Sequence, residues 1–257
     1  MEKNNKLKTL TVIIPALNEE KGIGPVIREI PIEKLEQMGY KTEVLVIDNN
    51  STDDTSKVAK DHGATVIVMP IRGYGNAYKA GFANASGDVI ATGDADLTYP
   101  FSILPEILLW MEKEDLDFIN TDRLTNLNKE AMSSSHELGN YVLSFLIKVL
   151  FGWPYKDSQS GMWIFKRSIW KQLTVTSSGM PFSQELKIEA FIHGFKCAEV
   201  PIEYRTRAGK EKLNTLKDGL GNITHLFIKR LSLTKQHVSR SVMLLIGGII
   251  GIKSKYD

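Results

Sequence analysis

Residues 87–96 read GDVIATGDAD, an apolar run that passes directly into two aspartates separated by one alanine. A short apolar run of this kind predicts a buried strand. Asp94 and Asp96 follow that strand, and the single small residue between them lets both carboxylates face one site. Hard divalent cations bind carboxylate oxygens and keep substrate phosphates in their remaining positions. The stretch therefore predicts a metal-bridged diphosphate site; the alternative is a polar loop after a strand.

Similar apolar runs recur on both sides of this stretch and alternate with helical segments. We expect strands at 10–14, 44–47, 65–69, 89–91 and 117–119, and helices at 20–30, 53–62, 76–84, 100–114 and 138–151. Such alternation predicts an α/β fold in which helices flank a mostly parallel sheet. Ligands of these sheets bind at the carboxyl ends of the strands. Polar clusters lie at those ends, at 18–19, 48–51, 72–76 and 94–96.

The composition is ordinary for a globular chain of 257 residues, and the formal net charge of +2 favours no class of partner. Cys197 is the single cysteine, which excludes an internal disulfide and favours a reducing compartment. Residues 1–8 are charged and lack the apolar core of a signal peptide. The run at 242–252 is shorter than the ~20 apolar residues of a spanning helix, so we expect a buried helix or an interfacial anchor there.

Positive charge is concentrated in the C-terminal part of the chain. Between Arg205 and Arg240 there are nine Lys and Arg residues against two acidic ones. Such a segment suits phosphates, an anionic lipid surface or nucleic acid, or is a solvated helix. Large aliphatic residues alternate with the basic ones, and the lack of an aromatic stacking platform argues against nucleic acid. The basic residues in this pattern are Lys217, Lys229, Arg230, Lys235 and Arg240.

This pattern predicts two parts of the chain. We expect a catalytic domain at 1–212 and, at 213–257, amphipathic C-terminal helices that contact a membrane surface. The expected helix at 138–151 is apolar on nearly every side, with Lys148 almost its only charge. A helix of this kind is buried in a core, lies on lipid or forms a dimer contact. A homo-oligomer is therefore one of the open alternatives.

Six motifs, in order along the chain, resemble those of family 2 glycosyltransferases. They are VIIPALNEE at 12–20, VIDNNSTDDT at 46–55, RGYGNA at 72–77, GDADLTYP at 93–100, DSQSGM at 157–162, and EVPI at 199–202 followed by Arg205 and by GKEKL at 209–213. The last three are similar to the branch that makes polyprenyl-phosphate (dolichyl-phosphate) hexoses. The resemblance runs from about residue 10 to 230 and implies the GT-A fold, a Rossmann-like sheet.

The resemblance also implies an activity. It implies a metal-dependent, inverting transfer of a hexose or N-acetylhexosamine from a UDP- or GDP-linked sugar to a polyprenyl (dolichyl) phosphate. It implies Mg²⁺ or Mn²⁺ as the cofactor and a peripheral position on the cytoplasmic, inner face of the membrane. Two alternatives stay open: a soluble family 2 enzyme that glycosylates a saccharide or protein hydroxyl, and a non-catalytic nucleotide-sugar binding protein. The presence of both Asp94 and Asp96 argues against the binding protein.

The resemblance assigns residues to the donor and to the metal. Asp94 and Asp96 would hold the metal against the diphosphate, where it offsets the charge that grows on the leaving group. Asp48 is equally suited to cap a helix, Glu19 to the first turn of one, and Arg72 to an ordinary turn. The residues assigned to the nucleotide-sugar are Pro15, Leu17, Glu19, Asp48, Asn50, Arg72, Asp94, Ala95 and Lys212.

The residues that act on the acceptor depend on what the acceptor is. A hydroxyl acceptor needs a carboxylate base, and Asp157 is the candidate. A lipid phosphate is already ionised and needs no base, so Asp157 would then orient a neighbouring residue. Cationic side chains would hold the phosphate. We therefore expect Asp96, Asp157, Arg123 and Arg205 to be catalytic. Arg207, Lys210 and Lys212 are further candidate cations, and for all of these cations the alternative is a solvated surface charge.

The chain departs from the family pattern at several positions. Asn49 stands where many members have a second aspartate, Met162-Trp163 where Phe-Arg is usual, and Glu211 where a serine is common. An arginine often found before the apolar helix is missing, and His136 lies near its place. These differences concern the sugar and the acceptor more than the class of reaction.

Overall fold

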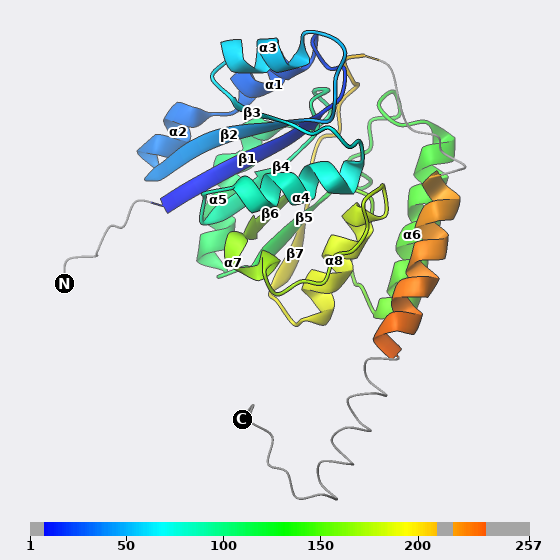
Figure 1. The fold of residues 1–257 in the computed structure, drawn as a ribbon. Coiled ribbons are helices and arrows are strands. Elements are labelled where there is room, and N and C mark those ends of the chain that lie inside the picture. Colours follow the sequence, from blue (N-terminus) through cyan, green and yellow to red (C-terminus); the bar gives the residue numbers. More distant parts are fainter. Residues whose placement is uncertain (1–7, 210–217, 235–257) are drawn as a thin grey trace, which may run out of the picture.

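The computed structural model describes residues 8–209 and 218–234, which form one sheet with helices around it (Figure 1). The seven strands lie in the order β3-β2-β1-β4-β6-β5-β7. Adjacent strands are parallel except that β6 runs antiparallel to β4 and β5. The predicted α/β class with a mostly parallel sheet is confirmed. The strands are β1 (Lys8–Ala16), β2 (Tyr40–Asp48), β3 (Thr65–Val68), β4 (Val89–Thr92), β5 (Phe118–Asp122), β6 (Trp163–Lys166) and β7 (Cys197–Pro201).

Helices cover both faces of this sheet because its central strands are apolar on both sides. Val12, Ile13 and Ile14 of β1 are all fully buried, although neighbouring side chains point to opposite faces. One core joins β1 and β4 to the helices α1 (Ile23–Glu29), α2 (Ile32–Gln37), α3 (Thr55–Asp61) and α5 (Leu104–Lys113). The opposite core lies under α4 (Tyr74–Asn84), α7 (Arg167–Trp170) and α8 (Phe182–Ile192). A 3₁₀ turn, η1 (Phe101–Ile103), leads into α5.

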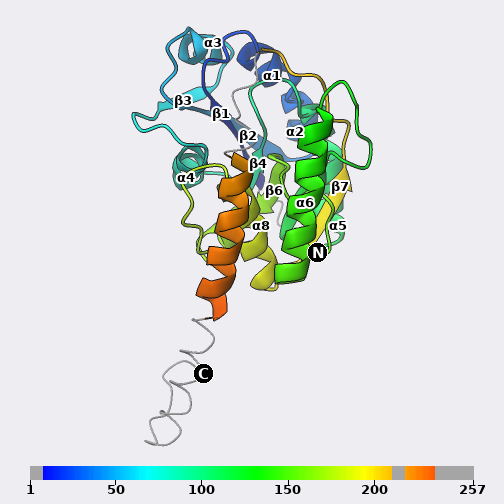
Figure 2. The same ribbon diagram turned by 90° about the vertical axis from the view of Figure 1, so that its right-hand side faces the viewer.

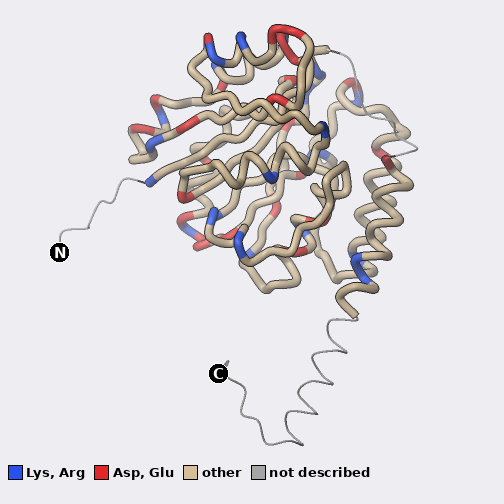
Figure 3. The backbone as a smooth tube through the Cα atoms, viewed as in Figure 1, with Lys and Arg blue, Asp and Glu red and all other residues tan. Residues whose placement is uncertain are grey.

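Two further helices pack side by side at one end of the sheet, α6 (Ser134–Phe151) and the helix at 218–234 (Figure 2). Their inner faces form a separate apolar core in which Leu143 and Ile147 meet Leu226. Their outer faces stay exposed: Phe145 is 64% exposed and Leu231 63%. The expected helix at 138–151 is therefore buried on one side only. Charged residues are sparse along both helices (Figure 3).

The prediction of an exposed basic face on the C-terminal segment is wrong at one position. Lys229 is buried, with its ammonium 3.1 Å from Glu185 Oε1 and 2.6 Å from Glu189 Oε1. It faces α8 because two buried carboxylates of that helix need a counter-charge. Arg230 beside it is exposed as expected. Lys217, Lys235 and Arg240 lie outside the described residues, as does the run at 242–252; within the described part of the chain, no helix is long and apolar enough to cross a bilayer.

Five elements were not predicted: α2, β6, α7, α8 and β7. The helix α8 shows why, because nine of its eleven residues are buried and they include Glu185, Lys187 and Glu189. Charged residues on a buried helix hide the apolar stripe by which a helix is recognised in a sequence. Their partners come from the loop before α8, from the helix at 218–234 and, for Lys187, from the loop 157–161. Nothing local in the sequence therefore identifies these charges as buried.

The order of the strands places the site. Strand β1 has β2 on one side and β4 on the other, so the chain connections run in opposite directions on the two sides of β1. At such a reversal the loops after the two central strands separate and leave a crevice at their carboxyl ends. The loop after β1 begins at Leu17 and the loop after β4 contains Asp94 and Asp96.

Candidate active site

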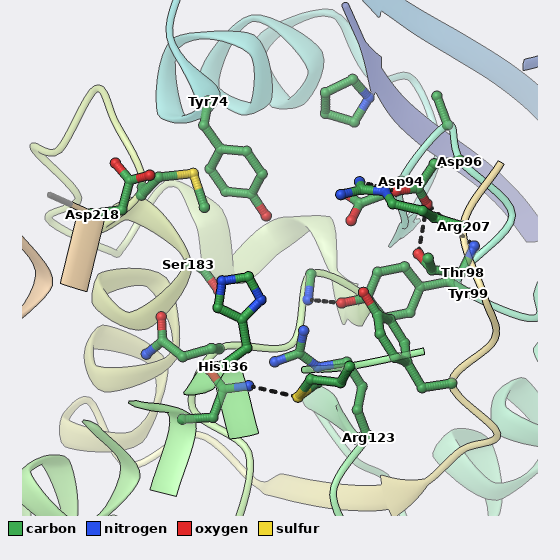
Figure 4. Close-up of a pocket in the computed structure, with 18 of the residues that line it drawn as sticks. Tyr74, Asp94, Asp96, Thr98, Tyr99, Arg123, His136, Ser183, Arg207 and Asp218 are labelled. Atoms are coloured by element: carbon green, nitrogen blue, oxygen red, sulfur yellow. Dashed lines mark hydrogen bonds and ion pairs between the residues drawn. The ribbon is translucent and has the colours of Figure 1, made fainter. Parts of the chain in front are cut away.

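A cavity of about 520 Å³ lies at the carboxyl ends of β1 and β4. Figure 4 shows Asp94, Asp96 and Arg207 on one side of it, and Ser183 and Asp218 on the other. Most lining residues come from segments that are far apart in the sequence: 15–19 at the end of β1 and just after it, 72–74 at the start of α4, 94–99 after β4, 131–143 around the start of α6, and 218–222 at the start of the last described helix. The cavity therefore joins the nucleotide motifs to the apolar helix pair.

The loop after β4 holds the Asp96 carboxylate by one of its two oxygens. Oδ1 accepts hydrogen bonds from the Thr98 backbone N–H (3.2 Å) and from the Thr98 hydroxyl (2.6 Å), across Leu97 with φ of +68°. Oδ2 forms an ion pair with the Arg207 guanidinium. Asp96 is only 2% exposed. Thr98 thus stabilises the turn, while the second oxygen of Asp96 is held by a cation.

Asp94 and Asp96 fit a divalent metal. Burial, followed by the charge of Asp96, raises the pKa of Asp94 to about 7. Such a rise is expected when two carboxylates lie close together away from solvent. A cation already lies against Asp96 Oδ2, so the donor set suits positive charge. Among the described residues no group of three or more His, Cys, Asp or Glu side chains is arranged to hold a metal ion. A metal held by two carboxylates keeps positions for phosphate and water. Bound there, a divalent metal would neutralise negative charge on a departing diphosphate.

Tyrosine hydroxyls gather at Gly161 on the floor of the cavity. The Gly161 backbone N–H donates to Tyr99 Oη at 2.6 Å. A methyl group on Gly161 would lie 3.1 Å from Tyr74 Oη, 3.3 Å from Tyr99 Oη and 3.5 Å from Asp94 Oδ1. Burial, followed by the charge of Asp94, raises the pKa of Tyr74 far above its usual value, so its hydroxyl stays protonated. Glycine at 161 is therefore what allows two hydroxyls to approach a carboxylate.

Arg123 and Asp157 form a buried two-pronged ion pair. Arg123 Nε lies 2.7 Å from Oδ2 and Nη2 lies 2.9 Å from Oδ1, and the Arg123 backbone N–H also donates to Oδ2 at 3.0 Å. Asp157 is fully buried and does not line the cavity, whereas Arg123 does and lies 5.2 Å from the Tyr204 ring centre. Burial opposes ionisation of Asp157, but the charge and hydrogen bonds of Arg123, together with the charge of Lys187, outweigh it, and the pKa of Asp157 lies below its usual value. The carboxylate stays charged and holds Arg123 in place.

Lys187 lies on the other side of this pair without lining the cavity. Its ammonium donates to the carbonyl oxygens of Ser158 (2.8 Å) and Ser160 (2.7 Å). Burial lowers the pKa of Lys187 to about 7. A neutral amine still has two N–H donors for these two carbonyls, so the loop 157–161 stays fastened in either protonation state.

Most of the residues assigned to the nucleotide-sugar line the cavity. Those that line it are Pro15, Leu17, Glu19, Arg72, Asp94 and Ala95. Asp48 does not: it is 4% exposed, accepts from the Ser51 backbone N–H at 2.8 Å and bonds the Ser56 hydroxyl. Asp48 therefore fixes the turn after β2. It is not the helix cap that the sequence also allowed, because α3 begins at Thr55 and Asp54 is its N-cap residue. The role of each residue in binding remains a prediction.

Two residues that were predicted to act in the site do not line the cavity, and in each case a nearby residue of the same type does. Asn50 is exposed, with φ of +66°, whereas Asn49 lines the cavity and its Oδ1 accepts from the Gly73 backbone N–H at 3.1 Å. Arg205 pairs with Glu29 at 2.7 Å and does not line the cavity, whereas Arg207 does. Lys212 and Lys210 lie outside the described residues.

Several cavity residues were not assigned from the sequence. Tyr74, Tyr99 and Tyr204 are aromatic, and aromatic residues are more often core residues than ligands. Tyr74 and Tyr99 nevertheless lie inside two of the motifs, next to Arg72 and Asp96, and that proximity was the available signal. His136, noted as a departure, lies in the first turn of α6 and lines the cavity.

Comparisons with known proteins concern the family and the fold of this chain. The family model described as glycosyl transferase family 2 matches residues 11–174. The low-salt glycan biosynthesis hexosyltransferase Agl6 of Haloferax volcanii is 37% identical over 222 residues, which are 86% of this chain but 53% of that protein, so this chain spans about half of it. The dolichyl-phosphate hexose transferase of the same organism is 33% identical over 82% of this chain and 89% of its own length.

Solved structures of similar fold include glucosyl-3-phosphoglycerate synthase from Mycobacterium tuberculosis. Its complex with Mn²⁺, UDP-glucose and glycerol 3-phosphate has a TM-score of 0.69 at 24% identity, and covers 87% of this chain and 80% of that one. Its complex with Mn²⁺, UDP and glucosyl-3-phosphoglycerate has a TM-score of 0.62 at 25% identity, with the same coverage. The helix-flanked, mostly parallel sheet described above is the GT-A fold of these neighbours.

Proposed function

Because this chain belongs to glycosyltransferase family 2, we propose that it moves a hexose or N-acetylhexosamine from a nucleotide diphosphate-sugar to a polyprenyl phosphate such as dolichyl phosphate. The transfer would invert the anomeric centre and depend on a divalent metal, Mg²⁺ or Mn²⁺. The name of the dolichyl-phosphate hexose transferase and the Mn²⁺ and UDP in the solved relative support the acceptor and the cofactor.

The observation that carries the proposal is the Arg123–Asp157 pair. A hydroxyl acceptor needs a base in the cavity, and Asp157 is fully buried, ionised and bound on both oxygens by Arg123. A phosphate monoester needs no base, because it is already ionised, but it needs positive charge. Arg123 supplies that charge at the cavity wall, and its position is fixed by Asp157.

The helix pair supports a lipid as the carrier of that phosphate. Residues of α6, such as His136, and the start of the helix at 218–234 line the cavity. Beyond the cavity, the outer faces of both helices expose apolar side chains: Leu138, Tyr141, Val142, Phe145 and Val149 on α6, and Leu220, Phe227, Ile228 and Leu231 on the other helix. We refer to these nine residues as the apolar helix face. Exposed apolar side chains next to a cavity suit a prenyl chain and the surface of a bilayer.

The chemistry follows from the positions of the charges. Asp94 and Asp96 would hold the metal at the donor diphosphate, and the metal would stabilise the leaving nucleoside diphosphate. Asn49 would hold the glycine loop against the donor through Gly73. The acceptor phosphate oxygen would attack the anomeric carbon while Arg123 binds its other oxygens, and no proton has to be removed.

One assay with two arms tests this proposal. The purified protein, Mg²⁺ or Mn²⁺, and labelled UDP- or GDP-sugars are incubated with and without dolichyl or undecaprenyl phosphate and then extracted into butanol. Label in the organic phase only when lipid phosphate and metal are both present would support the proposal and identify the donor nucleotide. Label that stays aqueous although nucleotide-sugar binds would contradict it and favour a small hydroxyl acceptor.

A further inference from the structure

The contact between Arg207 and Asp96 has a consequence for metal binding. Asp96 Oδ1 is engaged by two donors of Thr98, so Oδ2 is the oxygen that remains for a ligand. The Arg207 guanidinium already forms its ion pair with that same oxygen. A guanidinium and a divalent cation at the same carboxylate oxygen repel each other, so each weakens the other's contact with it. Arg207 and a divalent metal therefore compete for Asp96 Oδ2.

The backbone around Arg207 holds its guanidinium at this oxygen. The Ala208 backbone N–H donates to the Asp96 carbonyl at 2.8 Å, and the Arg205 backbone N–H donates to the Thr98 carbonyl at 3.1 Å. The segment 205–208 thus runs along the loop after β4 and is bonded to it on both sides of Arg207. The Arg207 side chain is 32% exposed while that of Asp96 is 3% exposed, so the guanidinium is the partner with room to move.

Protonation cannot resolve the competition, because a guanidinium keeps its charge at any ordinary pH. Arg207 must move away, and it then needs another anion. A donor diphosphate at Asp94 and Asp96 provides one, and its oxygens suit the planar fork of an arginine. Arg207 lines the same cavity as these two carboxylates, so the diphosphate would lie within its reach.

We propose that Arg207 blocks the metal-binding oxygen of Asp96 until a nucleoside diphosphate draws it away, so that metal and donor bind together and the metal alone binds weakly. This inference rests on the proposed metal-dependent transfer, and it adds the order in which the ligands enter. It gives Arg207 two successive anionic partners, and makes it the residue that couples the two ligands. By linkage, the factor by which nucleotide tightens metal binding equals the factor by which metal tightens nucleotide binding.

The test measures Mn²⁺ binding directly, by the loss of the free Mn²⁺ electron-spin signal, with no acceptor and no turnover. The wild-type protein and Arg207→Gln are titrated with Mn²⁺ alone and then with Mn²⁺ in the presence of UDP or GDP. We expect Arg207→Gln to bind Mn²⁺ alone about tenfold more tightly than the wild type, within the usual range of coupling between two sites. We also expect UDP or GDP to tighten Mn²⁺ binding by a smaller factor in the variant.

Two further variants locate the effect. Arg205→Gln removes a cation of the same segment that pairs with Glu29 instead of Asp96, and its affinity for Mn²⁺ alone should equal that of the wild type. Adding Asp96→Ala to Arg207→Gln should abolish the gain, which would place it at this carboxylate. Circular dichroism and thermal unfolding confirm that each variant is folded before it is compared.

The inference is overturned if Arg207→Gln binds Mn²⁺ alone no more tightly than the wild type, or if the gain survives Asp96→Ala. Absence of Mn²⁺ binding in every form would overturn it together with the metal dependence of the proposed function. A gain that is present while the lipid-phosphate assay fails would support the inference and overturn only the proposed acceptor.

Discussion

The ammonium of Lys229 lies 2.6 Å from Oε1 of Glu189, which fastens the helix at 218–234 to α8. The same ammonium lies 3.1 Å from Glu185 Oε1 and donates to the Thr174 carbonyl at 2.9 Å. Glu185 Oε2 in turn accepts from the Ser177 backbone N–H at 2.8 Å. One buried cation thus joins three parts of the protein: the last described helix, α8 and the loop before α8.

Replacing Lys229 with methionine should therefore cost about 3–5 kcal/mol of unfolding free energy, because two buried carboxylates lose their counter-charge. Urea unfolding followed by circular dichroism measures this. Arg230→Met is the matched control, because Arg230 is the exposed neighbour on the same helix, and it should stay within about 0.5 kcal/mol of the wild type. Equal losses of unfolding free energy in the two variants would contradict this role of Lys229.

The same cluster predicts a loss of stability in acid. Burial opposes ionisation of Glu185, but hydrogen bonds from His225 and Ser177, together with the charge of Lys229, outweigh it, so its pKa lies well below the usual value. A carboxyl whose pKa is lower in the folded than in the unfolded chain takes up protons on unfolding, so its contribution is present above about pH 4.3 and declines as pH falls further. Urea unfolding between pH 6 and 3 should show a steeper decline for the wild type than for Glu185→Gln. Parallel curves would contradict the prediction.

Asp96→Ala should lower transferase activity by at least about 100-fold, because it removes both the metal-binding oxygen and the partner of Arg207. The assay is butanol-extractable label at saturating Mn²⁺. Asp88→Ala is a suitable control, since Asp88 bonds Thr9 at the opposite end of β4 and does not line the cavity. Full metal-dependent turnover by Asp96→Ala would refute the site assignment.

Asp157→Asn should distinguish a positioning carboxylate from a catalytic base. If Asp157 only holds Arg123, the amide should raise KM for lipid phosphate, by roughly tenfold as for one lost charge-assisted contact, and leave the shape of the kcat pH profile unchanged. If Asp157 removes a proton, kcat itself should collapse and the acidic limb of its pH profile should disappear. Thermal unfolding must accompany the kinetics, because Arg123 loses its buried partner.

Phe145→Glu with Val149→Glu should release the protein from anionic vesicles. Both side chains are 64% exposed on α6 and belong to the apolar helix face. Two charges there would have to enter the headgroup region, so co-sedimentation with phosphatidylglycerol vesicles should fall by at least about tenfold. Leu109→Glu is the control, because Leu109 is 55% exposed on α5, outside this face. Equal binding by the double variant and the wild type would contradict a membrane contact through this face.

Of the residues predicted from the sequence, the structure brings together chiefly those that directly follow a strand. Asp94, Ala95 and Asp96 after β4, and Leu17 and Glu19 after β1, all line one cavity. The reason is general: parallel neighbours end at the same edge of a sheet, so the residues after each strand are brought together whatever the details of the loops. The family motifs placed these residues in the same site for the same reason.

Prediction was less accurate where a neighbour one or two positions away could take the same place. Asn49 rather than Asn50 lines the cavity, because Asn50 adopts a positive φ and its side chain is exposed. Lys229 was expected on an exposed basic face, but two carboxylates of α8 bury it. In both cases the sequence offers two chemically similar residues, and a local turn or a distant partner decides between them.

The sequence by itself determined the alternation of strands and helices, the mostly parallel sheet and the carboxylates at its edge, because these depend on local hydrophobic pattern and on the way strands end. Only the tertiary structure decided which arginine faces the cavity. Arg205 is bound by Glu29, 176 positions away, and Arg207 by Asp96, 111 positions away. Two cations in one extended segment are equivalent until the chain folds and brings their anions to them, and that long-range pairing is the physical reason why sequence alone could not choose between them.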